Sequence, residues 1–168
     1  MQNLKTALRH KLSDARKVAV LGVGSELRGD DAAGVAVARD VQEFIKKEGI
    51  GSAKVFLGET APENLTGEIK RFAPTHVVII DAVDLRQKPG AINIIDIENE
   101  ACASFSTHRM PFRILKDYLC GFIGCEVIII GIQPGSLAFN TGLSRKIQGS
   151  VKVVAQEIGS ALKMVLLV

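Results

Sequence analysis

Short apolar runs alternate along this chain with stretches in which apolar residues recur every three or four positions. The continuous runs are typical of buried β-strands, which are expected at residues 18–22, 53–57, 76–80, 91–95 and 126–130. The helical spacing predicts helices at residues 31–47, 62–73, 110–119 and 143–166. Leu4, Leu8 and Leu12 add one short amphipathic helix before the first strand.

Alternation of strands with helices predicts an α/β fold with right-handed crossovers and a sheet covered on both faces. We therefore expect a single domain over residues 1–168, built as three α/β/α layers around a mostly parallel five-stranded sheet. Residues 1–17 form an N-terminal helical extension in this prediction, and residues 91–95, after the Pro89–Gly90 turn, form a shorter edge strand. Ligands of such folds bind at the carboxyl ends of the strands.

Composition excludes several classes of protein. Lysine and arginine exceed aspartate and glutamate by 21 − 18 = 3, and aromatic residues make up 5%, so neither a basic stripe nor a stacking platform for nucleic acid is expected. The longest apolar runs, Val77–Ile80 and Val127–Ile130, are too short to cross a bilayer, and no export signal precedes Val18. The protein is expected in the cytoplasm, away from membranes, with Cys102, Cys120 and Cys125 as reduced thiols.

A glycine-rich segment, Gly22-Val-Gly-Ser-Glu-Leu-Arg-Gly-Asp-Asp-Ala-Ala-Gly34, follows the first strand. The segment does not match a dinucleotide-binding fingerprint, because Leu27 occupies the third glycine position. It does not match a phosphate-binding loop either, because Asp30 stands where lysine is required. Capping of the next helix explains one of the two adjacent carboxylates, Asp30 and Asp31. The other carboxylate is then a candidate for chemistry.

Two further residues are candidates for the same edge of the sheet. Asp81 ends a central apolar strand, and His108 precedes a predicted helix in a polar segment. With Asp31 they give two carboxylates and one imidazole, a donor set that suits an open site for a divalent transition metal. The spacing is not local, so the signal is weak by itself. His10 and His76 are interpreted as partly exposed side chains without a role, and no nucleophile elbow of the G-x-S-x-G type occurs.

The motifs together are similar to a known family. The Gly22–Gly34 segment, the strand ending in Asp81 and the Thr107-His108-Arg109-Met110-Pro111 segment resemble the NiFe-hydrogenase maturation endopeptidases. Further motifs resemble the branch that processes hydrogenase 3, of the formate-hydrogenlyase type: Ala61-Pro-Glu-Asn64, Pro89-Gly90 and Gly131-Ile-Gln-Pro134. Their joint order and spacing, from about Val18 to Val165, make the resemblance specific.

The resemblance implies an α/β/α hydrolase, classed with the aspartic-type peptidases, that removes a C-terminal peptide from the hydrogenase large-subunit precursor after nickel insertion. Nickel carried by that precursor serves for recognition, and the free protease holds no tightly bound cofactor. By motif, the residues that contact the nickel are Asp31, Asp81 and His108. The expected partner is the precursor alone, and the protease is expected to be a monomer.

Three positions depart from the family pattern. Ser25 stands where asparagine is usual, Ala32 where glycine is usual, and Glu59 lies two positions beyond the strand end at which members often carry an acid. Two other functions stay open. A nickel-dependent checkpoint or chaperone module would use the same three residues without shortening its partner. A generic α/β hydrolase or nucleotide-binding protein would need the phosphate cradle that Leu27 and Asp30 speak against.

Overall fold

The computed structural model describes residues 4–96 and 112–167. Its centre is a five-stranded sheet in the order β2-β1-β3-β5-β4. Four strands are parallel, and β4 pairs antiparallel with β5 at one edge, which confirms the mostly parallel sheet and the predicted edge strand. The strands are β1 (Val18–Val23), β2 (Ala53–Glu59), β3 (His76–Ala82), β4 (Ile92–Ile95) and β5 (Glu126–Ile132).

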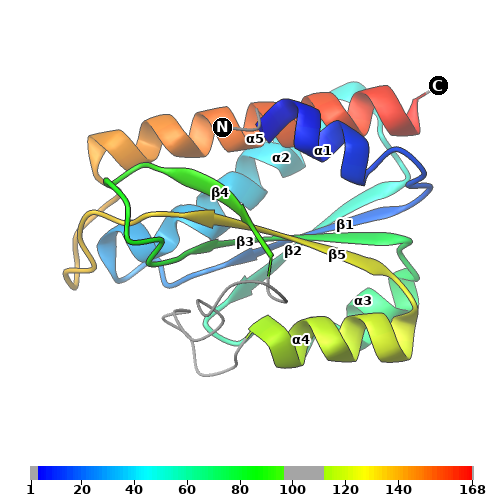
Figure 1. The fold of residues 1–168 in the computed structure, drawn as a ribbon, viewed down its shortest axis with the longest axis horizontal. Helices are drawn as coiled ribbons and strands as arrows, with labels where there is room; N and C mark the ends of the chain where they lie inside the picture. Colours follow the sequence, from blue (N-terminus) through cyan, green and yellow to red (C-terminus); the bar gives the residue numbers. More distant parts are fainter. Residues whose placement is uncertain (1–3, 97–111, 168) are drawn as a thin grey trace.

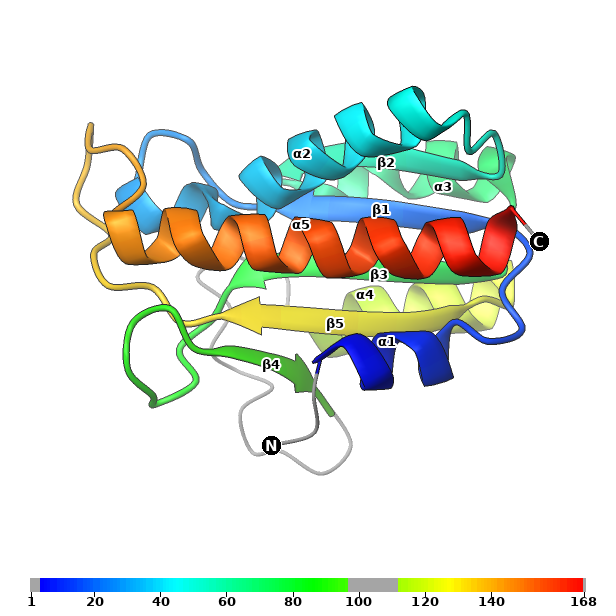
Figure 2. The same cartoon turned by 90° about the horizontal axis from the view of Figure 1, so that it is seen from above.

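Helices cover both faces of the sheet, so the predicted three-layer α/β/α architecture is confirmed (Figures 1 and 2). One face carries α1 (Leu4–Lys11), α2 (Ala33–Glu48) and α5 (Arg145–Leu166). The other face carries α3 (Thr66–Phe72) and α4 (Phe112–Tyr118). In Figure 2, α5 lies lengthwise over the middle of the sheet, between α2 and α1.

Several element boundaries differ from the predicted ones. The helix expected from residue 31 begins at Ala33, because Gly29–Ala32 form a tighter 3₁₀ turn first. A similar turn, Pro62–Leu65, precedes α3, and the chain after α4 continues as a π-helical turn over Leu119–Ile123. The strand expected at residues 76–80 runs on to Ala82, so Asp81 lies within a strand and not in the loop that follows.

Each central strand contributes to two hydrophobic cores, because successive side chains point to opposite faces of a sheet. In β3, Val78 and Ile80 pack beneath α1, α2 and α5, whereas Val77 and Ile79 pack beneath α3 and α4. All four side chains are fully buried. This double burial explains why the strand reads as one continuous apolar run and not as an alternating pattern.

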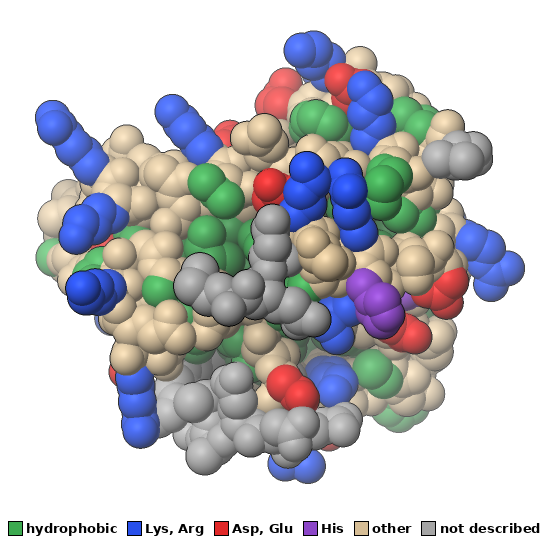
Figure 3. Space-filling model, turned by 45° about the horizontal axis from the view of Figure 1, so that its top comes forward, with side chains coloured by type: hydrophobic (Ala, Val, Ile, Leu, Met, Phe, Trp, Pro, Cys, Tyr) green, Lys and Arg blue, Asp and Glu red, His purple; other side chains and the backbone are tan. Residues whose placement is uncertain are grey.

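Apart from Asp30, Asp31 and Asp81, the aspartate, glutamate, lysine and arginine side chains that the structure describes are at least partly exposed. On the face shown in Figure 3, lysine and arginine side chains are spread over several elements, with acidic side chains between them. Such a distribution fits the small net charge of +3. Among the described residues, none of the helices combines the length and the hydropathy that a membrane span requires.

Candidate active site

Asp31 and Asp81 lie at the same end of two neighbouring parallel strands. Gly22 of β1 pairs with Ile80 of β3, so Asp81 follows directly at the carboxyl end of this pair. The chain leaves β1, forms a short loop and returns through the 3₁₀ turn that carries Asp31. The two carboxylates are therefore at the edge of the sheet where ligands of this fold class bind.

Two glycines permit this close return of the chain. Gly34, in the first turn of α2, lies so near the strand ends that a Cβ atom there would be 2.2 Å from the carbonyl oxygens of both Val23 and Ile80. Gly24 has a φ of +137°, and its Cβ would lie 1.8 Å from the carbonyl oxygen of Asp31. A side chain at either position would displace the turn that carries Asp31.

Both candidate carboxylates are buried and accept hydrogen bonds from backbone N–H groups. Asp31 is 1% exposed and its Oδ2 accepts a hydrogen bond of 3.0 Å from the Ser25 N–H. Asp81 is fully buried and its Oδ1 accepts one of 2.7 Å from the Ala82 N–H. Backbone N–H groups stabilise the ionised form of a buried carboxylate, and they fix its orientation. The Ser25 contact is made by the backbone, so it does not depend on the asparagine that is usual there.

Asp30 points in another direction and joins two loops. Its carboxylate accepts hydrogen bonds from the N–H groups of Gly135 and Ser136, both at 2.9 Å, and from the N–H and hydroxyl of Ser144 at 2.7 and 3.1 Å. Burial raises the pKa of this carboxyl, but the hydrogen bonds from Ser144, Ser136 and Gly135 outweigh it and the pKa is lowered.

The capping prediction is thus corrected in one respect. Ser144 is the residue that precedes α5, and no side-chain cap is found at the start of α2. The carboxylate of Asp30 therefore satisfies the N-terminus of the last helix, 114 positions along the chain, and not that of the helix it precedes. The same carboxylate joins its own turn to residues 135 and 136.

Gln133, in the motif that follows β5, fastens a third loop to the same end of the sheet. Its Oε1 accepts hydrogen bonds from the N–H groups of Leu85 and Gln87, at 2.7 and 3.3 Å. Its backbone carbonyl accepts one from the Gly90 N–H, 2.9 Å away. The segment that follows Asp81 and Ala82 at the end of β3 is in this way held against the loop after β5.

Glu59 occupies the end of β2 after a bulge, because Val23 pairs with Glu59 while Gly22 pairs with Leu57. Its φ is 47°, and its carbonyl accepts a hydrogen bond of 2.8 Å from the Gly24 N–H. Its side chain is exposed. The bulge explains why this acid comes two positions beyond the predicted strand and still lies at the carboxyl edge of the sheet.

His108, the polar segment that contains it and Cys102 lie outside the described residues. The structure therefore places two of the three predicted site residues, Asp31 and Asp81, at the carboxyl end of the parallel strands. Of the remaining cysteines, Cys125 is buried and Cys120 is half-buried. Burial raises the pKa of Cys125 to about 11, with a smaller contribution from neighbouring Cys120.

The prediction that His76 is partly exposed is wrong. The residue is buried, and its imidazole faces the carboxylates of Asp14 and Glu126 at the opposite end of the sheet. The signal that could have found it is its place: it starts a fully buried strand, on the same face as Val78 and Ile80. Nothing local could have shown which carboxylates it meets.

Known proteins resemble this chain over most of its length. The model of the hydrogenase maturation protease family (HycI) matches residues 35–161. The hydrogenase 3 maturation protease of Escherichia coli is 37% identical over 140 residues, which cover 83% of this chain and 86% of that protein. The crystal structure of a NiFe hydrogenase maturation protease from Thermococcus kodakarensis matches with a TM-score of 0.83 at 31% identity, covering 94% of this chain and 99% of that chain. The solution structure of an endopeptidase from Escherichia coli matches with a TM-score of 0.72 at 35% identity, covering 86% and 90%.

Proposed function

Because this chain belongs to the hydrogenase maturation protease family, we propose that it removes the C-terminal peptide from the large-subunit precursor of a NiFe hydrogenase. Cleavage follows insertion of nickel into the precursor, and the nickel is the feature that the protease recognises. The metal is thus part of the substrate and not a cofactor of the enzyme. In this proposal the protease is a monomer and acts in the cytoplasm.

Asp31, Asp81 and His108 are the residues that we propose contact the nickel. Two carboxylates and an imidazole supply oxygen and nitrogen donors, which suit a divalent first-row metal. The observation that supports the set is the arrangement of Asp31 and Asp81, buried and backbone-bonded at one edge of the sheet. Alternation along β3 puts Asp81 on the face to which residues 77 and 79 point, and α4 covers that face. In the sequence, His108 comes four positions before Phe112, the first residue of α4.

Contact with the nickel positions the scissile peptide beside these carboxylates, and positioning alone lowers the barrier to attack. Hydrolysis adds water to the scissile carbonyl and delivers a proton to the leaving amine. A carboxylate can take the proton from water, and nickel can polarise the carbonyl. The aspartic type of the peptidase is part of the same proposal, with Asp31 and Asp81 as its carboxylates.

Asp30 is a positioning residue in this scheme. Its carboxylate is already committed to the backbone of residues 135, 136 and 144, so it is not available to a substrate. It instead holds the loop after β1 against the loop after β5, and with it the turn that carries Asp31.

The test is cleavage of the nickel-loaded precursor by substituted proteases. Asp31→Asn, Asp81→Asn and His108→Ala should each lower the rate by about 100-fold or more, the usual contribution of a group acting in proton transfer or metal contact. Asp40→Asn, an exposed carboxylate on α2, is the matched control and should cleave at the wild-type rate. Full cleavage by all three site variants would contradict the residue assignment.

The same assay separates the protease from a checkpoint module. A checkpoint would bind the nickel-loaded precursor and leave its mass unchanged. Binding that depends on Asp31 and Asp81 without loss of the C-terminal peptide would therefore replace the proposed hydrolysis with recognition alone.

A further inference from the structure

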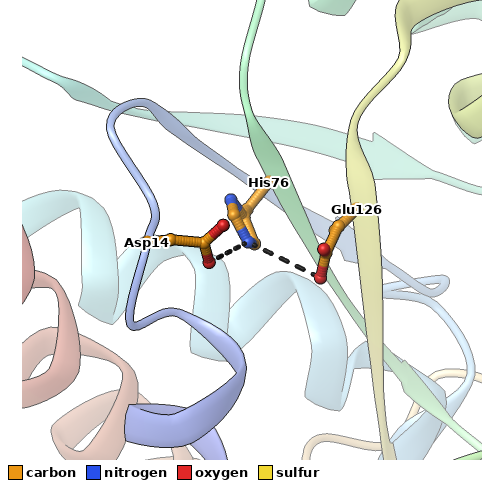
Figure 4. A group of neighbouring side chains, drawn as sticks. All are labelled: Asp14, His76 and Glu126. Carbon is orange, nitrogen blue, oxygen red and sulfur yellow. Dashed lines mark ion pairs between the residues drawn. The ribbon is translucent and has the colours of Figure 1, made fainter.

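A second group of potential metal ligands lies at the amino end of the sheet (Figure 4). Asp14 follows α1, His76 begins β3 and Glu126 begins β5. One ligand atom from each side chain lies within 4.8 Å of the other two. Alternation along the strands puts His76 and Glu126 on the face covered by α1, whereas Asp81 points to the opposite face. The group is therefore separate from the candidate active site in both strand end and sheet face.

The imidazole of His76 is buried with one ring nitrogen aimed at the two acids. Its side chain is 3% exposed, whereas those of Asp14 and Glu126 are 79% and 71% exposed. Nε2 is a buried nitrogen without a hydrogen-bond partner. It lies 3.5 Å from Asp14 Oδ1 and 3.7 Å from Glu126 Oε2. A charge-assisted hydrogen bond between such groups measures about 2.7–2.9 Å, so these separations are too long for direct bonds.

The other ring nitrogen is fixed by Thr75. The Thr75 hydroxyl oxygen lies 3.1 Å from His76 Nδ1. The same oxygen accepts hydrogen bonds from the N–H groups of Arg16 and Lys17, which anchors it in the segment between α1 and β1. Histidines that bind metals generally hold their second nitrogen in this way, because it sets the ring orientation and the tautomer. With the proton on Nδ1, the lone pair of Nε2 faces the carboxylates.

The spacing of the three ligand atoms suits a cation between them. Metal–ligand bonds of about 2.0–2.2 Å in a tetrahedral site separate neighbouring ligand atoms by about 3.4 Å. The separations of 3.5 and 3.7 Å from Nε2 to the two carboxylate oxygens are near that value. We propose that Asp14, His76 and Glu126 bind a divalent transition cation of the zinc class, with the fourth position open to water.

Such a cation would have a structural effect. Asp14 lies in the connection from α1 to β1, while His76 and Glu126 start two neighbouring strands of the sheet. Binding would link the N-terminal helical segment to β3 and β5. The proposal is independent of proteolysis, because none of the three residues belongs to the candidate active site.

Zinc binding by the purified full-length chain tests the proposal. The wild type is compared with Asp14→Asn/Glu126→Gln, which removes both exposed carboxylates and leaves the buried imidazole in place. The wild type should bind one more zinc ion per chain than this double variant, and zinc should raise the Tm of the wild type by more than it raises that of the variant. The chain has three histidines, so ¹⁵N spectra of the imidazoles can show that the Nε2 signal of His76 shifts on binding.

The matched control is Glu43→Gln/Asp117→Asn, which removes the same charge from exposed positions on other helices. It should bind zinc like the wild type. The candidate active site remains in every variant, so zinc bound there contributes equally and cancels in the comparison. Equal zinc content in wild type and double variant, or an unchanged His76 signal, would overturn the proposal and leave the group as contacts of His76 with two surface carboxylates. The double variant should still process the nickel-loaded precursor.

Discussion

The two ends of the sheet carry similar donors in opposite environments. At the carboxyl end, the carboxylates of Asp31 and Asp81 are buried and held by backbone N–H groups. At the amino end, the imidazole of His76 is buried and the carboxylates that face it are exposed. Buried carboxylates must be preorganised by their surroundings, which suits a site that receives a substrate. Exposed carboxylates around a fixed imidazole suit an ion that links parts of one chain.

A substitution that disturbs the carboxyl end alone should have the largest effect. Gly34→Ala places a Cβ 2.2 Å from the carbonyl oxygens of Val23 and Ile80, so the start of α2 and the turn with Asp31 must move. We expect a loss of about 1–3 kcal/mol in the free energy of unfolding, as for other overpacked sites, together with loss of processing. Urea denaturation and the cleavage assay measure the two effects.

Gly67→Ala is the control for that substitution. Gly67 lies in α3 with open space around it, so alanine there should be neutral or stabilise the protein by up to about 1 kcal/mol. Zinc binding at the amino end should survive in Gly34→Ala. Normal processing by Gly34→Ala would show that the carboxyl end tolerates displacement, contrary to the account.

The next effect concerns stability and is expected from Asp30→Asn, which removes the charge that joins the loops after β1 and β5. An amide oxygen is a weaker acceptor for the N–H groups of Gly135, Ser136 and Ser144, and its NH₂ group faces donors. We expect the variant to lose about 2–4 kcal/mol in the free energy of unfolding at neutral pH. Urea denaturation against Asp40→Asn measures it.

The pH dependence of that loss follows from the pKa of Asp30. Because the folded-state pKa lies below the ordinary value of 3.8, the carboxylate contributes its full stability above pH 3.8 and loses it as pH falls through the lowered pKa. The difference between wild type and Asp30→Asn should therefore be constant near neutral pH and narrow in acid. A difference that widens in acid would contradict the hydrogen-bond assignment.

The smallest effect concerns the thiols near the amino end. Cys125 directly precedes β5, but its buried thiol has a pKa raised to about 11, and it donates a hydrogen bond to the Leu119 carbonyl. Only about one thiol in a thousand is ionised at pH 8, so Cys125 should resist alkylation in the folded protein. Peptide mapping after brief alkylation measures this. Rapid zinc-sensitive labelling of Cys125 would instead make the thiol a metal ligand.

Periodicity in the sequence was sufficient to predict the layers and the five strands of the sheet, because apolar runs and helical spacing report burial directly. It also predicted the position of Asp81, because an acid at the end of a central apolar strand lies at the carboxyl end of the sheet in such a fold. Periodicity could not predict which residues contact Asp30 and His76. Ser144 is 114 positions from Asp30, and the acids that face His76 come from separate elements. Periodicity shows which face a residue occupies, but the meeting of distant loops depends on how all the elements pack.

The proposed activity is cleavage of a nickel-loaded precursor at the carboxyl end of this sheet. The most direct measurement is the intact mass of a hydrogenase large-subunit precursor, with and without nickel, after incubation with the wild-type protein and with Asp81→Asn. We expect loss of the C-terminal peptide only from the nickel-loaded precursor and only with the wild type. Equal cleavage of the nickel-free precursor, or unchanged mass in every sample, would contradict the proposal.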